Sequence, residues 1–174
     1  TTMSKLINNL VNAAKIEYDS YKMDFTRFDL VELFYEVFNE FKLALQKKNI
    51  KIYFNRKKWK KFVVAADRKG MEDVLRNLTG NAIKFSPDNS RIDVELDIKN
   101  YDVYIKIKDC GIGIPPEDID KIFEKLYRAK NSKSISVKGT GLGLFIVKNI
   151  IQKHNGEITV SSEVGKGTMF EIHF

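Results

Sequence analysis

Apolar side chains recur at steps of three and four in four stretches of the chain, which is the spacing of a buried helix face. The predicted helices cover residues 1–22, 30–47, 67–85 and 141–154. Asp29 and Asp67 precede the second and third helices as N-cap residues, and Pro87 ends the third. The first helix has a coiled-coil-like stripe that needs another helix to bury it, so we expect it to be a piece of a larger helical assembly.

Other stretches alternate apolar and polar residues with a period of two, as half-buried strands do. The predicted strands cover residues 23–28, 50–54, 62–66, 91–98, 102–109, 157–162 and 168–174. A tight turn at Asn100 joins the fourth strand to the fifth. Strands and helices come in runs and do not alternate strictly. This order predicts an α+β fold with one mixed sheet and with helices on one of its faces.

The periodicity weakens over residues 111–139. Pro115 and Pro116 open a short helix that we expect to reach Phe123, and residues 129–138 are rich in Lys, Ser and Asn. A span of this length between two glycine-rich segments is typical of a mobile lid over a site.

Composition excludes several classes of protein. The 174 residues suffice for one buried core plus a short appendage, and 43% hydrophobic with 30% charged residues is ordinary for a globular protein. No apolar run is long enough to span a bilayer, and the first residues do not have the pattern of a signal peptide. The single Cys110 cannot form an internal disulfide, and one cysteine with two histidines excludes the usual zinc clusters.

The net charge of +7 permits polyanionic partners. Most lysines are scattered and do not form the clustered basic face that nucleic acid requires, so we expect no nucleic-acid partner. The one basic run, residues 56–61, is most simply a solvated turn between two strands. A patch for a membrane surface or an acidic partner is the alternative.

Residues 139–144 read Gly-Thr-Gly-Leu-Gly-Leu and lead directly into the last predicted helix. A glycine-rich loop before a helix N-terminus suits phosphate, because unpaired N–H groups and the helix dipole both favour negative charge. Close packing of the first helical turn would also use glycines. The spacing matches neither the dinucleotide fingerprint nor the Walker loop, and residues 165–168 are not a Walker loop either.

Asn77, Asn81 and Lys84 fall at i, i+4 and i+7 on the third predicted helix, hence on one face. Amide oxygens are hard, neutral ligands that suit Mg²⁺, and the lysine can meet a phosphate oxygen. Three solvent-facing polar residues are the alternative. After the fifth strand, Asp109-Cys-Gly111-Ile-Gly113 places a carboxylate beside a flexible turn. It can accept from the exocyclic amine of adenine, or simply cap the turn.

Four motifs occur in order: residues 77–84, 109–115, 123–128 and 139–144. Together they resemble the catalytic ATP-binding domain of sensor histidine kinases, in the superfamily that includes gyrase B, the Hsp90 chaperones and MutL. The resemblance implies a two-layer α/β sandwich of Bergerat type, with a mixed sheet of about five strands and about three helices on one face. It also implies that residues 1–22 end the second helix of a dimerisation hairpin, and that the ATP-binding domain spans 23–174.

The resemblance also implies residue roles, with ATP and Mg²⁺ as ligands. Asn81 resembles the Mg²⁺ ligand, assisted by Asn77; Lys84 resembles a phosphate contact, and Arg128 a contact to the γ-phosphate. Asp109 matches the acceptor of the adenine amine. The other residues implied in nucleotide binding are Gly111, Gly113, Ile114, Phe123, Tyr127, Lys138, Gly139, Thr140, Gly141, Leu142, Gly143, Leu144 and Thr168. The lid would run from about 114 to 140.

Hydrolytic members of the superfamily carry a Glu base where this chain has Asn77, so the resemblance favours phosphotransfer over hydrolysis. The phosphoacceptor histidine of the family has no counterpart here, and we expect His154 and His173 to be structural. The implied partners are the protein's own dimerisation and phosphoacceptor domain and the receiver domain of a response regulator. We expect a cytoplasmic fragment without membrane contact, from a protein that could be anchored elsewhere. A conformational ATPase and a non-catalytic nucleotide-binding module are the alternatives.

Overall fold

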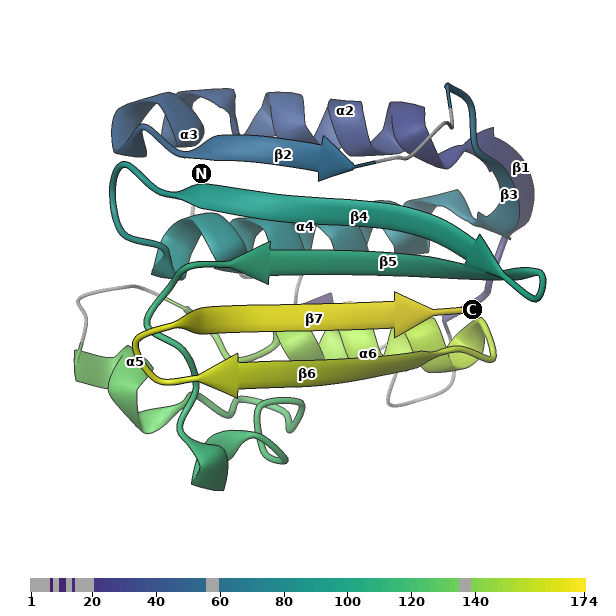
Figure 1. Cartoon of the computed structure of the whole chain (residues 1–174). Coiled ribbons are helices and arrows are strands. Elements are labelled where there is room, and N and C mark those ends of the chain that lie inside the picture. The colour runs from purple at the N-terminus through teal and green to yellow at the C-terminus, as the bar shows by residue number, and fades with distance from the viewer. Residues whose placement is uncertain (1–6, 8–9, 12–13, 15–20, 56–59, 135–138) are drawn as a thin grey trace.

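The computed structural model describes residues 7, 10–11, 14, 21–55, 60–134 and 139–174. Five strands form one sheet in the order β2 (Lys51–Asn55), β4 (Arg91–Lys99), β5 (Asp102–Asp109), β7 (Gly167–His173) and β6 (Glu157–Glu163) (Figure 1). Strand β2 runs parallel to β4, and the other neighbours are antiparallel. The predicted mixed sheet of five strands is confirmed.

The turn between β4 and β5 also follows the prediction. Asn100 and Tyr101 both have positive φ, at 51° and 74°. Two central residues with positive φ give a two-residue hairpin turn whose twist matches that of the strands.

The remaining strands, β1 (Phe25–Asp29) and β3 (Val63–Asp67), form a separate antiparallel pair. The expectation of one sheet is therefore wrong. Each strand of the pair runs without a loop into a helix, because Asp29 caps α2 (Leu30–Glu40) and Asp67 caps α4 (Arg68–Phe85). The pair is thus bound to the starts of two helices and lies beyond one end of the main sheet (Figure 1).

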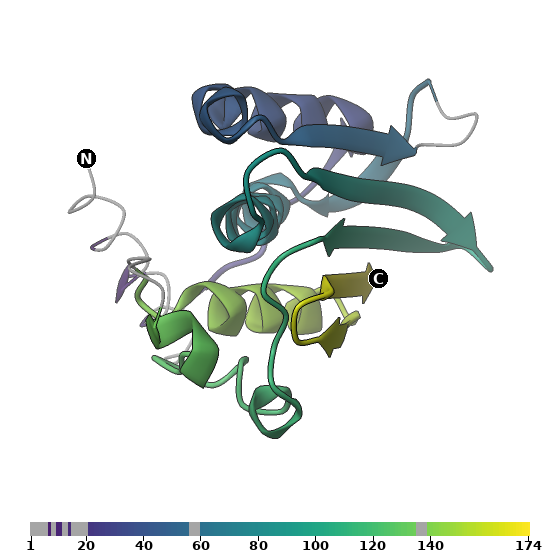
Figure 2. The ribbon, with the colours of Figure 1, turned by 60° about the vertical axis from the view of Figure 1, so that its left-hand side comes forward.

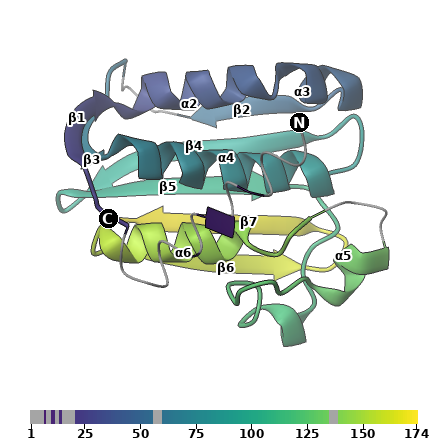
Figure 3. The same ribbon diagram turned by 180° about the vertical axis from the view of Figure 1, so that it is seen from behind.

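Helices α2, α4 and α6 (Gly143–Lys153) all lie on one face of the five-stranded sheet (Figures 2 and 3). The core fills the space between the two layers. Its largest fully buried side chains are Phe34, Leu30, Leu33, Met71, Leu75, Leu78, Ile92, Leu96, Ile105, Ile107, Leu142 and Ile146. The predicted two-layer α/β sandwich with about three helices on one face is confirmed.

One predicted helix, over residues 30–47, is broken in two. Helix α2 ends before Phe41, whose backbone leaves helical geometry at φ −94° and ψ 3°, and α3 (Lys42–Lys48) follows. The ring of Phe41 lies over Gly80 of α4, at a distance where a Cβ on that glycine would be only 3.3 Å from Cζ. This contact with another helix could not be read from local periodicity.

The segment between β5 and α6 is only partly regular. The short helix expected to reach Phe123 is a single 3-10 turn, η1 (Pro116–Asp118), followed by turns, and an unexpected helix, α5 (Lys130–Ser134), lies further on. Most of residues 1–22 fall outside the described part of the chain. Ile7, Leu10 and Val11 are helical there and exposed, so the assignment of this segment to a dimerisation hairpin stays a prediction.

Candidate functional site

Helices α4 and α6 run antiparallel, and the candidate site lies where α6 begins. At one end of the pair, a Cβ atom at position 143 would lie 2.7 Å from Asn77 Oδ1. At the other end, His154 follows α6 and its ring nitrogen Nε2 accepts from the backbone N–H of Asp67 at 3.0 Å. Helix α4 is continuous from Arg68 to Phe85 and so keeps Asn77, Asn81 and Lys84 on one face, as predicted.

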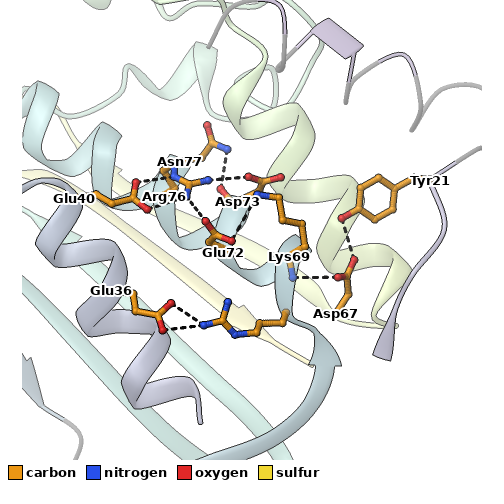
Figure 4. A network of polar contacts seen from close by, with 10 residues as sticks. Tyr21, Glu36, Glu40, Asp67, Lys69, Glu72, Asp73, Arg76 and Asn77 are labelled. Carbon is orange, nitrogen blue, oxygen red and sulfur yellow. Dashed lines mark hydrogen bonds and ion pairs between the residues drawn. The ribbon is translucent and has the colours of Figure 1, made fainter. Parts of the chain in front are cut away.

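The amide of Asn77 is oriented by its own helix. Its nitrogen Nδ2 donates to the carbonyl of Asp73 at 2.8 Å, so its oxygen Oδ1 is the atom that points to Gly143 (Figure 4). An amide oxygen is a hard, neutral group that can serve as a ligand for Mg²⁺. The amide of Asn81 has no hydrogen-bond partner within the described part of the chain.

A polar network on the solvent side of α4 ties this helix to α2 (Figure 4). Arg76 donates to Glu40 of α2 at 2.8 and 2.9 Å and contacts Glu72 and Asp73 of α4. The hydrogen bonds to Glu40 first and then to Glu72 raise the pKa of Arg76. Arg68 makes a two-pronged contact with Glu36 at 2.7 and 2.8 Å. The carboxylates of α4 that flank Asn77 on the N-terminal side are therefore engaged with an arginine.

Two cations meet where the glycine loop passes α4. A Cβ atom at position 139 would lie 2.6 Å from Lys84 Nζ. Burial and then the charge of nearby Arg128 lower the pKa of Lys84. Arg128 also donates to the carbonyl of Ser132 at 3.2 Å. A bound polyanion would relieve the repulsion between these cations, so this corner suits phosphate groups.

The first turn of α6 completes the phosphate end. Its N-cap position is Leu142, whose side chain is buried and makes no cap, so no side chain in the described part of the chain caps the first N–H groups of α6. Gly141 precedes it at φ +71°, and a Cβ there would lie 2.5 Å from the carbonyl carbon of Leu126. This glycine therefore lets the lid backbone lie against the loop, where Leu126 N–H donates to Gly141 O at 3.0 Å.

Asp109 forms the other end of the site, at the end of β5. Its carboxyl is 6% exposed, and Oδ1 accepts the backbone N–H groups of Gly111 at 2.7 Å and Thr168 at 3.2 Å. Burial raises the pKa of Asp109 to about 6, although these two hydrogen bonds favour its charged form. Neither hydrogen bond uses Oδ2, which can accept from a ligand amine. A Cβ on Gly111 would lie 2.7 Å from the carbonyl of Phe85, so the end of α4 touches this turn.

The β6–β7 hairpin holds the start of the lid. Ser162 Oγ accepts the N–H of Ile114 at 2.9 Å and lies 2.8 Å from Thr168 Oγ1. A Cβ on Gly113 would lie 2.1 Å from the carbonyl oxygen of Glu163. Close approach of this hairpin therefore already requires a glycine at 113, and the implied part of Gly113 in nucleotide binding stays a prediction.

Inside the lid, Asp118 is fully buried and joins two separate segments. It accepts from the hydroxyl of Tyr127 at 2.7 Å and from the N–H of Lys130 at 2.8 Å, and these bonds lower the pKa of Asp118. The same bond raises the pKa of Tyr127 to about 12. Phe123 packs its ring edge-on against Phe170 of β7. Tyr127 and Phe123 therefore anchor the lid.

The structure thus brings Asn77, Lys84 and Arg128 together with the glycine loop. Asp109 and Thr168 lie at the turn that contacts the C-terminal end of α4. Lys138 lies outside the described residues. Sequence reasoning missed three residues that shape the lid: Asp118, Ser162 and Asn131, whose amide donates to Gly113 O at 2.9 Å. The burial of Asp118 could not be predicted, because a single acidic residue in a polar segment belongs to no hydrophobic periodicity.

Two further observations limit the site. Among the described residues, no group of three or more His, Cys, Asp or Glu side chains could hold a metal ion, and no helix is long and apolar enough to cross a bilayer. A groove of about 410 Å³ lies elsewhere, beside Tyr35 and Leu45, and none of its lining residues belongs to the four motifs. The candidate site is assembled from helix ends and loops.

Known proteins are similar to this chain in sequence and in fold. The model of the family "Histidine kinase-, DNA gyrase B-, and HSP90-like ATPase" matches residues 66–174, more than half of the chain. The sensor histidine kinase WalK of Bacillus subtilis (strain 168) is 30% identical over 168 residues, which cover 95% of this chain and 27% of WalK. The sensor protein SrrB of Staphylococcus aureus (strain NCTC 8325 / PS 47) is 32% identical over 170 residues, which cover 98% of this chain and 29% of SrrB.

Solved structures agree. The catalytic domain of the histidine kinase ThkA has a TM-score of 0.76 at 32% identity, over 87% of this chain and 95% of that domain. The histidine kinase AdeS of Acinetobacter baumannii has a TM-score of 0.82 at 24% identity, over 99% of this chain and 78% of that chain, and so shows the fold alone. The chain spans less than a third of WalK and SrrB. It belongs to the family of histidine kinase-, DNA gyrase B- and HSP90-like ATPases, and the relatives it matches are sensor histidine kinases.

Proposed function

We propose that this chain binds Mg²⁺ and ATP and transfers the γ-phosphoryl group to a histidine on a dimerisation domain outside the chain. One observation carries the proposal: Lys84 and the start of α6 offer positive groups at one place, and the buried carboxyl of Asp109, at the end of β5, offers an acceptor at another. This arrangement fits a ligand with a polyanion at one end and an amine-bearing base at the other. The match to 95% of the ThkA catalytic domain supports it.

Each end of the site has its own task. Asp109 Oδ2 would accept from the exocyclic amine of adenine, while Lys84, Arg128 and the first N–H groups of α6 would hold phosphate oxygens. Asn81 and Asn77 would present amide oxygens to Mg²⁺, which takes its other ligands from water and phosphate. The metal would supply charge neutralisation on the phosphates. Lys138, Thr140 and Leu144 complete the nucleotide-binding set as predictions from the sequence.

Transfer is favoured over hydrolysis by what surrounds Asn77. An amide cannot take a proton from water, and Glu72 and Asp73, the carboxylates nearest to it along α4, contact Arg76. A histidine nitrogen from the partner domain would form the new bond to phosphorus while the bond to the ADP oxygen breaks. A response-regulator aspartate would then receive the phosphoryl group. A cytoplasmic location belongs to the same proposal.

Incubation with γ-labelled ATP, Mg²⁺ and the separate phosphoacceptor domain of a relative such as SrrB tests the proposal. We expect an acid-labile, alkali-stable label on the acceptor domain, and none on an acceptor domain whose histidine is replaced by alanine. Steady phosphate release without labelling would instead indicate a conformational ATPase. Tight ATP binding with neither labelling nor release would indicate a non-catalytic nucleotide-binding module.

A further inference from the structure

The C-terminal end of α4 is held by a lysine from another helix. Lys48, the last residue of α3, is half-buried, and its Nζ donates to the carbonyls of Ile83 at 2.9 Å, Ser86 at 2.5 Å and Lys84 at 3.4 Å. An ammonium group has three protons, and here three carbonyl oxygens receive them. The contacts span 35 to 38 residues of sequence.

A helix end leaves carbonyls without partners and carries partial negative charge, so a cation there is favourable. Helix α4 has no glycine to close it, because its C-cap is Ser86 in extended geometry. The neighbouring loop is tied to the same place, since Asn89 N–H donates to the carbonyl of Lys48 at 2.8 Å. Lys48 therefore fixes the last turn of α4 and the chain that leaves it.

The three carbonyls surround Phe85, and both ends of the candidate site begin there. Lys84 places its ammonium group beside Gly139 of the glycine loop, and the carbonyl of Phe85 lies against Gly111, whose N–H binds Asp109. A shift of the last turn of α4 would therefore move two groups together: Lys84, which is proposed to contact phosphate, and Asp109, which is proposed to accept from the adenine amine.

We propose that Lys48 is a positioning residue of the nucleotide site, which sets Lys84 and the Asp109–Gly111 turn at once through the carbonyls of α4. The inference rests on the proposed function, because it takes Lys84 and Asp109 as ligand contacts. Lys48 itself contacts the helix end and need not touch nucleotide.

The test compares Lys48→Met with Lys47→Met, which removes the same charge from an exposed neighbour on α3. Dissociation constants for adenosine, ADP and ATP are measured well below the unfolding midpoint of each variant. We expect Lys48→Met to weaken all three ligands by about tenfold or more, the range typical when a group that holds a ligand-contacting residue is removed. Lys84→Met should weaken ADP and ATP only, and Lys47→Met none.

A second pair of variants guards against misfolding. Lys48→Arg should retain most of the affinity, since guanidinium also donates to several carbonyls, and Lys48→Gln should give an intermediate loss. Unchanged affinities in folded Lys48→Met or Lys48→Gln, with only a lower unfolding temperature, would show a purely structural lysine and overturn the inference. Equal losses in Lys47→Met would also overturn it. Failure of the unaltered chain to bind any of the three ligands would refute the proposed function instead.

Discussion

Replacing Asp109 by Asn changes one ligand-facing atom and little else. Oδ1 of Asp109 accepts two backbone N–H groups, from Gly111 and Thr168, and the amide oxygen of Asn can keep both. The amide nitrogen then takes the place of Oδ2. A donor would thus face the amine of adenine where the carboxylate presents an acceptor.

The substitution should affect binding and folding in opposite directions. Loss of a hydrogen bond to a charged group costs about 1.5–3 kcal/mol, which is about 10- to 150-fold in ATP affinity. The pKa of Asp109 is about 6 when folded and 3.8 when unperturbed, so its contribution to stability is full below pH 3.8 and is lost as the pH rises through 6. At about 1.4 kcal/mol per pKa unit this loss is up to about 3 kcal/mol at pH 7, and a neutral Asn avoids it.

Calorimetric titration at pH 7 with ATP and with inosine triphosphate, which carries a carbonyl oxygen in place of the amine, measures the effect. We expect Asp109→Asn to lose affinity for ATP and not for inosine triphosphate, and the nucleotide-free variant to unfold no lower than wild type. Asp102→Asn, at the exposed start of the same strand, is the control and should change neither. Unchanged ATP affinity, or equal losses for both nucleotides, would refute the assigned role.

Three further predictions concern Arg128, His154 and Gly141. Arg128→Ala should slow phosphotransfer far more than it weakens ADP binding, because only ATP presents a γ-phosphate; equal effects in transfer and ADP titrations would count against this. Burial lowers the pKa of His154 below 6.5, so the free energy of unfolding should fall as the pH drops below 6.5, and urea titrations of His154→Gln should lack this component. Gly141→Ala should be destabilised by about 1–3 kcal/mol through its positive φ and its clash with Leu126, whereas Gly165→Ala, at φ +80° with nothing within 4 Å, should lose less in the same assay.

Much of this fold could be predicted because its signals are local. The apolar stripe of α4 and the Asp67 cap involve residues within one or two turns, and alternation along β4 and β5 reports a sheet with one covered face. The break of the second predicted helix could not be predicted, because the apolar stripe continues across Phe41, and the contact of Phe41 with Gly80 of another helix leaves no local signal.

The candidate site also has features that follow from local sequence and features that depend on tertiary packing. Asn77 and Lys84 fall on one face by helical spacing alone, whereas their alignment with Gly143 and Gly139 depends on how α6 packs against α4. Asp118 could not be found, because its partners Tyr127 and Lys130 are brought to it by irregular turns. The split into two sheets was missed for a related reason, since pairing partners of strands are not encoded in their alternation.

At the end remote from the phosphates, α4 and α6 are joined through Asp67 and His154, and Tyr21 from the preceding segment donates to Asp67 at 2.9 Å. Asn77 lies ten residues further along, about 15 Å at the rise of an α-helix. The hydrogen bond between the backbone of Asp67 and the ring of His154 therefore ties the two helices together at this end. Since Tyr21 binds the carboxylate of the same Asp67, a force on the chain ahead of Tyr21 would reach the tied ends of both helices first.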